Sequence, residues 1–107
     1  MCIRDSIYLA GTPATSGLVA WKDSISPNDA LITKIFREAG AVFHVKTTNP
    51  QTLMSLETHS NLFGRTVNAF NRNLTPGGSS GGEGALIAMR GSVLGIGTDI
   101  GLSLIHI

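Results

Sequence analysis

A run of glycine and serine, Gly77-Gly78-Ser79-Ser80-Gly81-Gly82, stands directly before a small and apolar segment, residues 83–89. By composition alone the run would suit a flexible linker. The following segment, however, is typical of a helix packed closely on a sheet, and the glycine-interrupted residues 92–98 predict a buried strand. Glycine-rich loops before helices expose backbone N–H groups and let a ligand approach closely. We therefore expect a ligand-facing loop, then a helix and a strand.

A second helix-and-strand unit is predicted upstream. Ser26 is a suitable N-cap, Pro27 suits the first helical position, and Asp29 stands where a capping-box acid reaches back. An apolar stripe at helical spacing follows, and Gly40 supplies the C-terminal stop. Residues 41–45 then predict a short buried strand. This order of elements is typical of α/β proteins.

Composition excludes several classes of function. The 107 residues carry 8 Lys+Arg and 7 Asp+Glu, so no electrostatic attraction to nucleic acid or to an anionic membrane is expected. The single cysteine, Cys2, excludes a disulfide framework and a cysteine-rich zinc site, and neither His44 nor His59 has a metal partner at useful spacing. No membrane segment and no signal peptide are apparent, which favours a cytoplasmic location.

The glycine run admits alternatives that rest on its spacing alone. Gly77 and Gly82 have the gap of a P-loop, but Glu83 stands where that motif needs a lysine. Ser80 is the central residue of a formal G-x-S-x-G motif, but no buried strand precedes it. A non-catalytic module that binds an anion in a backbone nest over residues 77–82 stays open.

The longer sequence PGGSSGGEGALIAMRGSVLGIGTDIG, residues 76–101, resembles the signature of the amidase signature family. The similarity extends upstream through residues 40–66 and covers nearly all of residues 7–101, including features of acetamidase-like and fatty-acid-amide-hydrolase-like members. The family consists of serine hydrolases that cleave carbon–nitrogen bonds of amides. The resemblance implies a partial amidase domain over residues 7–101. It also implies an α/β fold, a fragment of an α/β/α layer structure around a central mixed sheet.

The resemblance also implies a Ser–cis-Ser–Lys triad. One serine attacks the amide carbonyl, a second serine relays its proton to a neutral lysine, and backbone N–H groups stabilise the oxyanion. Neither a metal nor a cofactor is implied, and the expected substrate is a small-molecule amide, small or aliphatic. Ser79 matches the bridging cis-serine, and Ser80 matches a supporting hydroxyl. Thr98 and Asp99 match a structural pair of the family, and Ile100 and Gly101 match the start of its oxyanion loop. The segment that lines the family's substrate channel corresponds to Leu53, Met54 and Ser55.

The two ends depart from the family pattern. Counting back from Gly11 places the catalytic lysine at Arg4, and arginine cannot act as a neutral base. Ser103 stands at the position of the nucleophile, but Leu102 replaces a glycine of the oxyanion loop. Back-translation derives residues 1–6 and 102–107 from one short DNA and its reverse complement, which resembles the transposon end used in sequencing libraries. We therefore expect both ends to be non-native and Ser103 to be a coincidence.

These observations predict an amidase as the parent protein and an inactive fragment in this chain. Lys22-Asp23 is not a substitute for the missing lysine, because it follows the Thr15–Gly17 segment and is expected to be a solvent-exposed pair. Within the family, the alternative is the A-type subunit that amidates glutamyl-tRNA together with partner subunits. The non-catalytic anion-binding module is the alternative from a different class.

Overall fold

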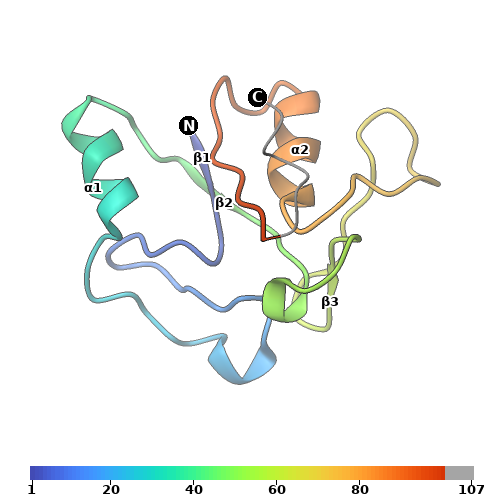
Figure 1. Cartoon of the computed structure of the whole chain (residues 1–107), viewed down its shortest axis with the longest axis horizontal. Coiled ribbons are helices and arrows are strands. Elements are labelled where there is room, and N and C mark those ends of the chain that lie inside the picture. The colour runs from blue at the N-terminus through green and yellow to red at the C-terminus, as the bar shows by residue number, and fades with distance from the viewer. Residues whose placement is uncertain (101–107) are drawn as a thin grey trace.

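Two short strands that are distant in the sequence form the centre of the fold. In the computed structural model, which describes residues 1–100, β1 (Cys2–Arg4) and β2 (Val45–Thr47) pair in parallel, with Ile3 opposite Lys46. The three residues of β1 are completely buried. Parallel strands need a crossover connection. Residues 5–44, which include α1 (Leu31–Glu38), provide it on the side of the sheet away from α2 (Figure 1).

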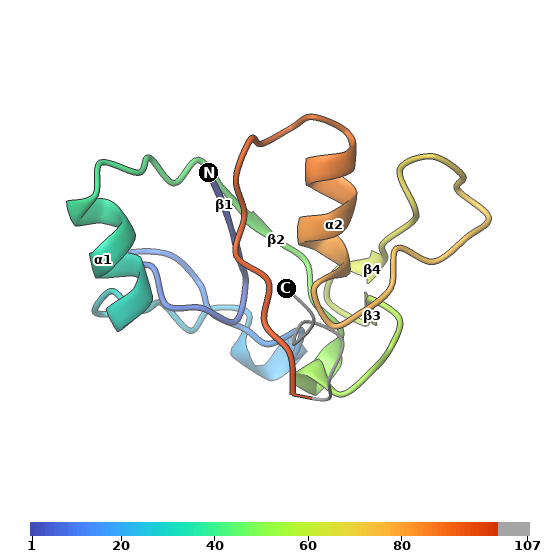
Figure 2. The ribbon, with the colours of Figure 1, turned by 45° about the horizontal axis from the view of Figure 1, so that its top comes forward.

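Helix α2 (Gly81–Ala88) packs against both strands, as Figure 2 shows. It begins inside the glycine run, and its first two residues, Gly81 and Gly82, are buried. A Cβ atom at Gly81 would collide with the Thr58 side chain, and one at Gly82 would collide with the backbone of Thr48. Glycine is therefore required for this close approach. The predicted helix after the glycine run is confirmed, with its start two residues earlier than expected.

Residues 92–98 run beside β1 as extended chain (Figure 2). The backbone N–H of Cys2 donates a hydrogen bond to the carbonyl of Leu94, at 2.9 Å. This segment of the described chain forms no β-strand, and Val93 is fully exposed. The prediction of a buried strand here was therefore wrong, because a single backbone bond to β1 does not make a ladder.

The predicted start of the upstream helix was also wrong. Helix α1 begins at Leu31, its N-cap is Ala30, and no side chain caps it. Ser26 lies earlier, in a loop where its backbone N–H binds the carbonyl of Thr12 at 2.9 Å. The Asp29 carboxylate accepts hydrogen bonds from the Ala10 N–H at 2.7 Å and from Arg37 Nε at 2.9 Å. Long-range contacts thus use the Asp29 carboxylate, while the buried Ser26 hydroxyl has no hydrogen-bond partner among the described residues.

The β-prone run at residues 41–45 is displaced in the structure. Val42 is exposed, and β2 begins only at Val45, where pairing with β1 starts. His44, expected within a buried strand, is exposed, and its Nε2 lies 3.1 Å from the Gly91 carbonyl oxygen. Pairing with β1, rather than local β propensity, decides where this strand begins.

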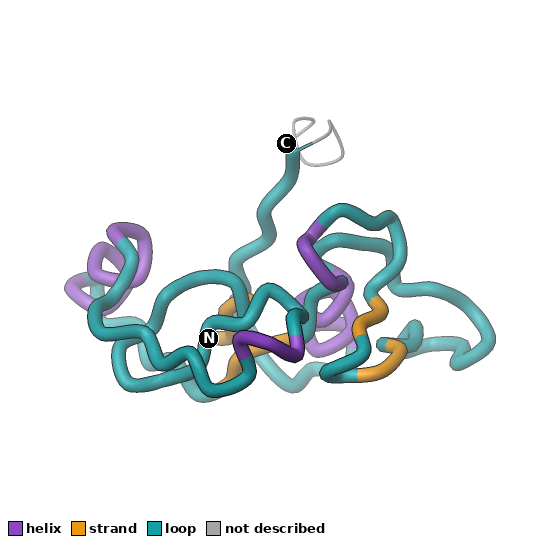
Figure 3. Tube along the Cα trace, turned by 90° about the horizontal axis from the view of Figure 1, so that it is seen from below, coloured by secondary structure: helices purple, strands orange, loops and turns teal. Residues whose placement is uncertain are grey.

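The remaining elements are short. Figure 3 shows the antiparallel pair β3 (His59–Ser60) and β4 (Gly64–Arg65) apart from the parallel pair. Single 3₁₀ turns lie at Val19–Trp21 and Gln51–Leu53. Lys22 and Asp23 follow the first turn as an exposed ion pair with a 2.8 Å separation, as predicted. Within residues 1–100, neither α-helix nor 3₁₀ turn has the length and apolar character needed to cross a bilayer.

Candidate functional site

The loop that leads into α2 holds the serine pair. The peptide bond between Gly78 and Ser79 is cis, and Ser80 is the N-cap residue of α2. A Cβ atom at Gly78 would lie 2.5 Å from the carbonyl oxygen of Ser55 and 2.9 Å from the carbonyl carbon of Leu56. The loop therefore rests directly on the backbone of the 55–57 segment, an approach that only glycine permits. This packing places Ser79 beside the residues expected to line the substrate channel.

The side chain of Arg4, at the end of β1, reaches both serines. Its Nη2 donates to Ser79 Oγ at 3.0 Å and to the Ser79 carbonyl at 3.2 Å, and its Nη1 donates to Ser80 Oγ at 3.1 Å. Arg4 is completely buried, and its Nε has no hydrogen-bond partner among the described residues. Burial lowers the pKa of Arg4 from its ordinary value, while the negative charge of Glu83 acts in the opposite direction. The position reached by counting back from Gly11 is thus in contact with both serine hydroxyls.

Thr98 closes the other side of this cluster. Ser80 Oγ donates to the Thr98 carbonyl and accepts from the Thr98 N–H, each at 3.1 Å. Arg4 Nη1 also contacts Thr98 Oγ1. The predicted structural role of the next residue, Asp99, stays a prediction, while its side chain borders a cavity beside Ile100. Gly101 and Ser103 lie outside the described residues.

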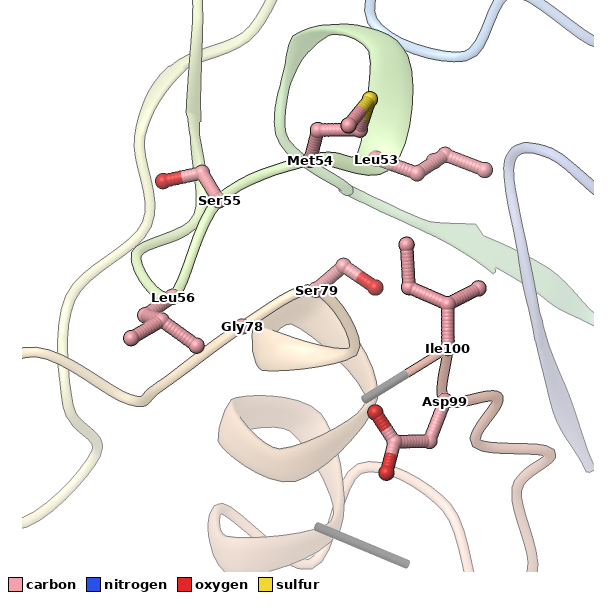
Figure 4. A pocket seen from close by; sticks show the side chains of 8 residues that line it. All are labelled: Leu53, Met54, Ser55, Leu56, Gly78, Ser79, Asp99 and Ile100. Atoms are coloured by element: carbon pink, nitrogen blue, oxygen red, sulfur yellow. The ribbon is translucent and has the colours of Figure 1, made fainter. Parts of the chain in front are cut away.

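A cavity of about 320 Å³ opens in front of Ser79. Figure 4 shows Ser79 between the 53–56 segment and Ile100. The predicted channel residues Leu53, Met54 and Ser55 all line this cavity, together with Leu56. Met54 is 77% exposed, so its side chain belongs to the cavity wall and not to a core. Leu56 was missed, because only its position next to the channel segment could have indicated it.

The buried carboxylate of Glu83 is the residue of this region that sequence reasoning most clearly missed. Its Oε1 accepts a hydrogen bond from Thr47 Oγ1 at 2.6 Å, and its Oε2 accepts from Cys2 Sγ at 2.8 Å and from the Ile96 N–H at 3.1 Å. Burial, together with the bond to Glu83, raises the pKa of Cys2. Glu83 thereby connects α2 to β1, to β2 and to the extended segment before Thr98. In the sequence, Glu83 gave only one signal: it stands where a P-loop would need a lysine.

The glycine run is not arranged as an open anion nest. The N–H of Gly77 donates to Thr75 Oγ1 and that of Gly81 to Thr58 Oγ1, each at 3.1 Å. Two of the donors that would face an anion are therefore already used. The part of the chain before the run, residues 68–76, contains no strand of the kind that a nucleophile elbow requires. Within residues 1–100, no cluster of three or more His, Cys, Asp or Glu side chains is suited to a metal ion.

A cis peptide bond at Ser79, a second hydroxyl beside it and a basic side chain from the adjacent strand define a paired-serine site on an α/β scaffold. A family model described as Amidase matches residues 1–105, and the chain belongs to this family. The predicted family and the predicted α/β fold class are both confirmed.

The similar proteins include two fungal acetamidases. That of Emericella nidulans is 48% identical over 102 residues, and that of Aspergillus oryzae is 51% identical over 102 residues. Each alignment covers 95% of this chain but only 19% of the relative, so the chain spans about a fifth of the length of these proteins.

Solved structures give the same result for the fold. A fatty acid amide hydrolase superposes with a TM-score of 0.88 at 38% identity, covering 92% of this chain and 17% of the other. The A-type subunit of the glutamyl-tRNA(Gln) amidotransferase of Thermotoga maritima superposes with a TM-score of 0.77 at 31% identity, covering 81% of this chain and 19% of that protein.

Proposed function

We propose that the protein to which this chain belongs hydrolyses the carbon–nitrogen bond of a small or aliphatic amide through a Ser–cis-Ser–Lys triad. The observation that carries the proposal is the contact between Ser79 Oγ and the basic side chain at position 4, at 3.0 Å, beside an open cavity. Ser79 is the bridging hydroxyl and Ser80 its support. The nucleophile comes from the oxyanion loop that begins at Ile100.

The chemistry needs a base at position 4 that can accept a proton. When the nucleophilic hydroxyl attacks the amide carbonyl, its proton passes to Ser79 Oγ, and the proton of Ser79 passes to the base. The same group later returns a proton to the departing nitrogen. A neutral lysine can do this, whereas a guanidinium has N–H donors, no acceptor, and remains protonated. With Arg4 donating to Ser79 Oγ, the chain as it stands is inactive.

The cavity supports an aliphatic acyl group as the part of the substrate that is recognised. Apolar side chains line it at Leu53, Met54, Leu56 and Ile100, and the Ser79 side chain lies beside them. Apolar surface binds an alkyl chain by removing it from water. No nucleic-acid partner follows from the composition, and this expectation and the cytoplasmic location stay predictions.

Activity measurements on two proteins test the proposal. The purified chain is assayed with a simple anilide, and no turnover is expected. Turnover that disappears in the Ser79→Ala variant would overturn the inactivity of the chain. The full-length gene that contains residues 7–101 is expressed and assayed in the same way, and it is expected to release the amine. Failure of that protein to hydrolyse any short aliphatic amide would overturn the proposed activity.

An A-type amidotransferase subunit is the second candidate, because such a protein from Thermotoga maritima superposes on most of this chain. It would need partner subunits and glutamyl-tRNA. Glutamine hydrolysis that appears only with partner subunits would favour it over a free-standing amidase. The anion-binding module is disfavoured by the paired N–H groups of Gly77 and Gly81.

A further inference from the structure

The parallel strand pair has a second face, and a separate cavity of about 340 Å³ lies there. Neighbouring side chains of a strand point to opposite faces. Thr47 therefore reaches Glu83 on the α2 side, at 2.6 Å, while Lys46 reaches the carbonyl of Pro13 on the other side, at 2.5 Å. Within residues 1–100, this cavity shares no lining residue with the cavity at Ser79.

The half-buried Lys46 ammonium in the wall of this second cavity has donors for a further acceptor. An ammonium has three donors, and Lys46 donates to the Pro13 carbonyl. The nearby Asp5 carboxylate already accepts from the Thr15 N–H at 3.1 Å and from Thr15 Oγ1 at 2.8 Å. Burial lowers the pKa of Lys46, and the charge of Asp5 offsets this only in part. An added negative charge at Nζ would offset the desolvation of the half-buried cation.

The rest of the cavity determines what kind of anion fits. Leu62 and Phe63 line it together with Pro13, so much of the wall is apolar. Lys22 supplies a second cation, but it is already paired with Asp23. With Asp5 also in the wall, a multiply charged phosphate would meet repulsion. A single carboxylate with an apolar tail matches both the charge and the walls.

We propose that the cavity between Lys46 and Phe63 is a binding site for a small carboxylate with an aliphatic tail. The carboxylate accepts hydrogen bonds from Lys46 Nζ, and the tail lies against Leu62 and Phe63. The site is independent of Ser79 and holds whether or not the serine site belongs to a catalytic enzyme.

The test is a titration of the isotope-labelled chain with sodium hexanoate, followed through backbone amide signals. Saturable shifts are expected at Lys46, Thr48 and Phe63. The Lys46→Met variant removes the charge but keeps most of the side-chain volume, and it should weaken hexanoate binding about tenfold. Lys34→Met is the matched control, because Lys34 is exposed on α1 and outside the cavity, and it should bind as the parent chain does.

Hexanamide and hexylamine have the same tail and separate the charge from the apolar contribution. Both should bind at this cavity at least about fivefold more weakly than hexanoate. The proposal is overturned if hexanamide binds there equally well, if Lys46→Met binds hexanoate unchanged, or if hexanoate shifts only residues around Ser79. It is also overturned if Lys34→Met weakens binding as much as Lys46→Met does. If Lys46→Met loses its dispersed amide signals and is therefore unfolded, Lys46→Gln is titrated with hexanoate in its place. The same results then support or overturn the proposal.

Discussion

Nη2 of Arg4 donates a hydrogen bond to Ser79 Oγ at 3.0 Å, across 75 positions of the sequence. The resemblance to the family implies a neutral lysine at this position, which would accept a proton from the serine. The direction of the observed hydrogen bond is the opposite, because the guanidinium is the donor. A guanidinium can hold the serine hydroxyl but cannot receive its proton. In the proposed mechanism, this contact keeps a basic side chain beside Ser79 but supplies no proton acceptor.

In the full-length parent, lysine at position 4 should act as the base. Compared with arginine there, it should raise kcat about 10²–10⁴-fold, the usual range for a general base. The comparison uses amine release from a short aliphatic anilide. Arg37→Lys, on exposed α1, is the control and should leave kcat unchanged. Equal kcat values for lysine and arginine at position 4 would contradict the assigned role.

Arg4 should also contribute to stability, because it bonds to Ser79, Ser80 and Thr98 from a completely buried position. Arg4→Met should lower the free energy of unfolding by about 2 kcal/mol, since hydrogen bonds to charged groups are lost. Urea unfolding measures the change. Arg37→Met removes the ion pair between the exposed Arg37 side chain and Asp29 and should change stability much less. Equal losses of unfolding free energy in Arg4→Met and Arg37→Met would contradict a stabilising role of the Arg4 hydrogen bonds.

Gly95 should not tolerate a side chain. A Cβ atom there would collide with Glu83 Oε2 and lie 2.8 Å from Cys2 Sγ. Gly95→Ala is therefore expected to lower the free energy of unfolding by about 1–3 kcal/mol, the usual cost of overpacking. In Gly84→Ala the nearest atom to the new Cβ is 3.9 Å away, on an exposed position of α2, so stability should rise slightly. Thermal unfolding of the Gly95→Ala and Gly84→Ala variants tests this prediction. A Gly95→Ala variant as stable as the parent would contradict it and would show that the Glu83 side chain can move away.

Asp29 should make the stability of the chain sensitive to acid. Its hydrogen bonds with Arg37 and with the Ala10 N–H lower the pKa of the carboxyl. A lowered pKa in the folded state stabilises the fold above the ordinary carboxyl pKa, and this contribution is lost as the pH falls through the lowered value. Asp29→Asn should be less stable than the parent at neutral pH, with a difference that shrinks on acidification. A carboxyl signal of Asp29 that titrates at the ordinary value would contradict the prediction.

The source DNA provides a test of the two ends. If residues 1–6 and 102–107 are foreign, the parent gene should encode Lys-Asp where Arg4-Asp5 stands and Gly-Ser-Ile/Val-Arg in the loop after Gly101. Sequencing across both junctions measures this directly. Genomic DNA that itself encodes both ends would show that they are native, and Arg4 would then be the parent's own residue.

Much of the candidate site was predictable because it is local in sequence. The signature around Ser79 and Ser80 indicated the family, and the channel segment from Leu53 to Ser55 does line the cavity beside them. Their catalytic roles stay predictions. Secondary structure was less predictable: Asp29 has the chemistry of a helix start but binds the Ala10 N–H and Arg37 instead, and the buried Ser26 hydroxyl caps no helix.

By itself, the sequence determined the α/β class, and its resemblance to a known signature determined the family, because both depend on residues that lie close together along the chain. Only the tertiary structure decided that Arg4 meets Ser79, that Glu83 joins both strands, and that Lys46 faces a second cavity. Each of these contacts joins segments that are distant along the chain. Their geometry follows from how the buried strand pair, the helix and the loops pack together, and no local pattern carries that information.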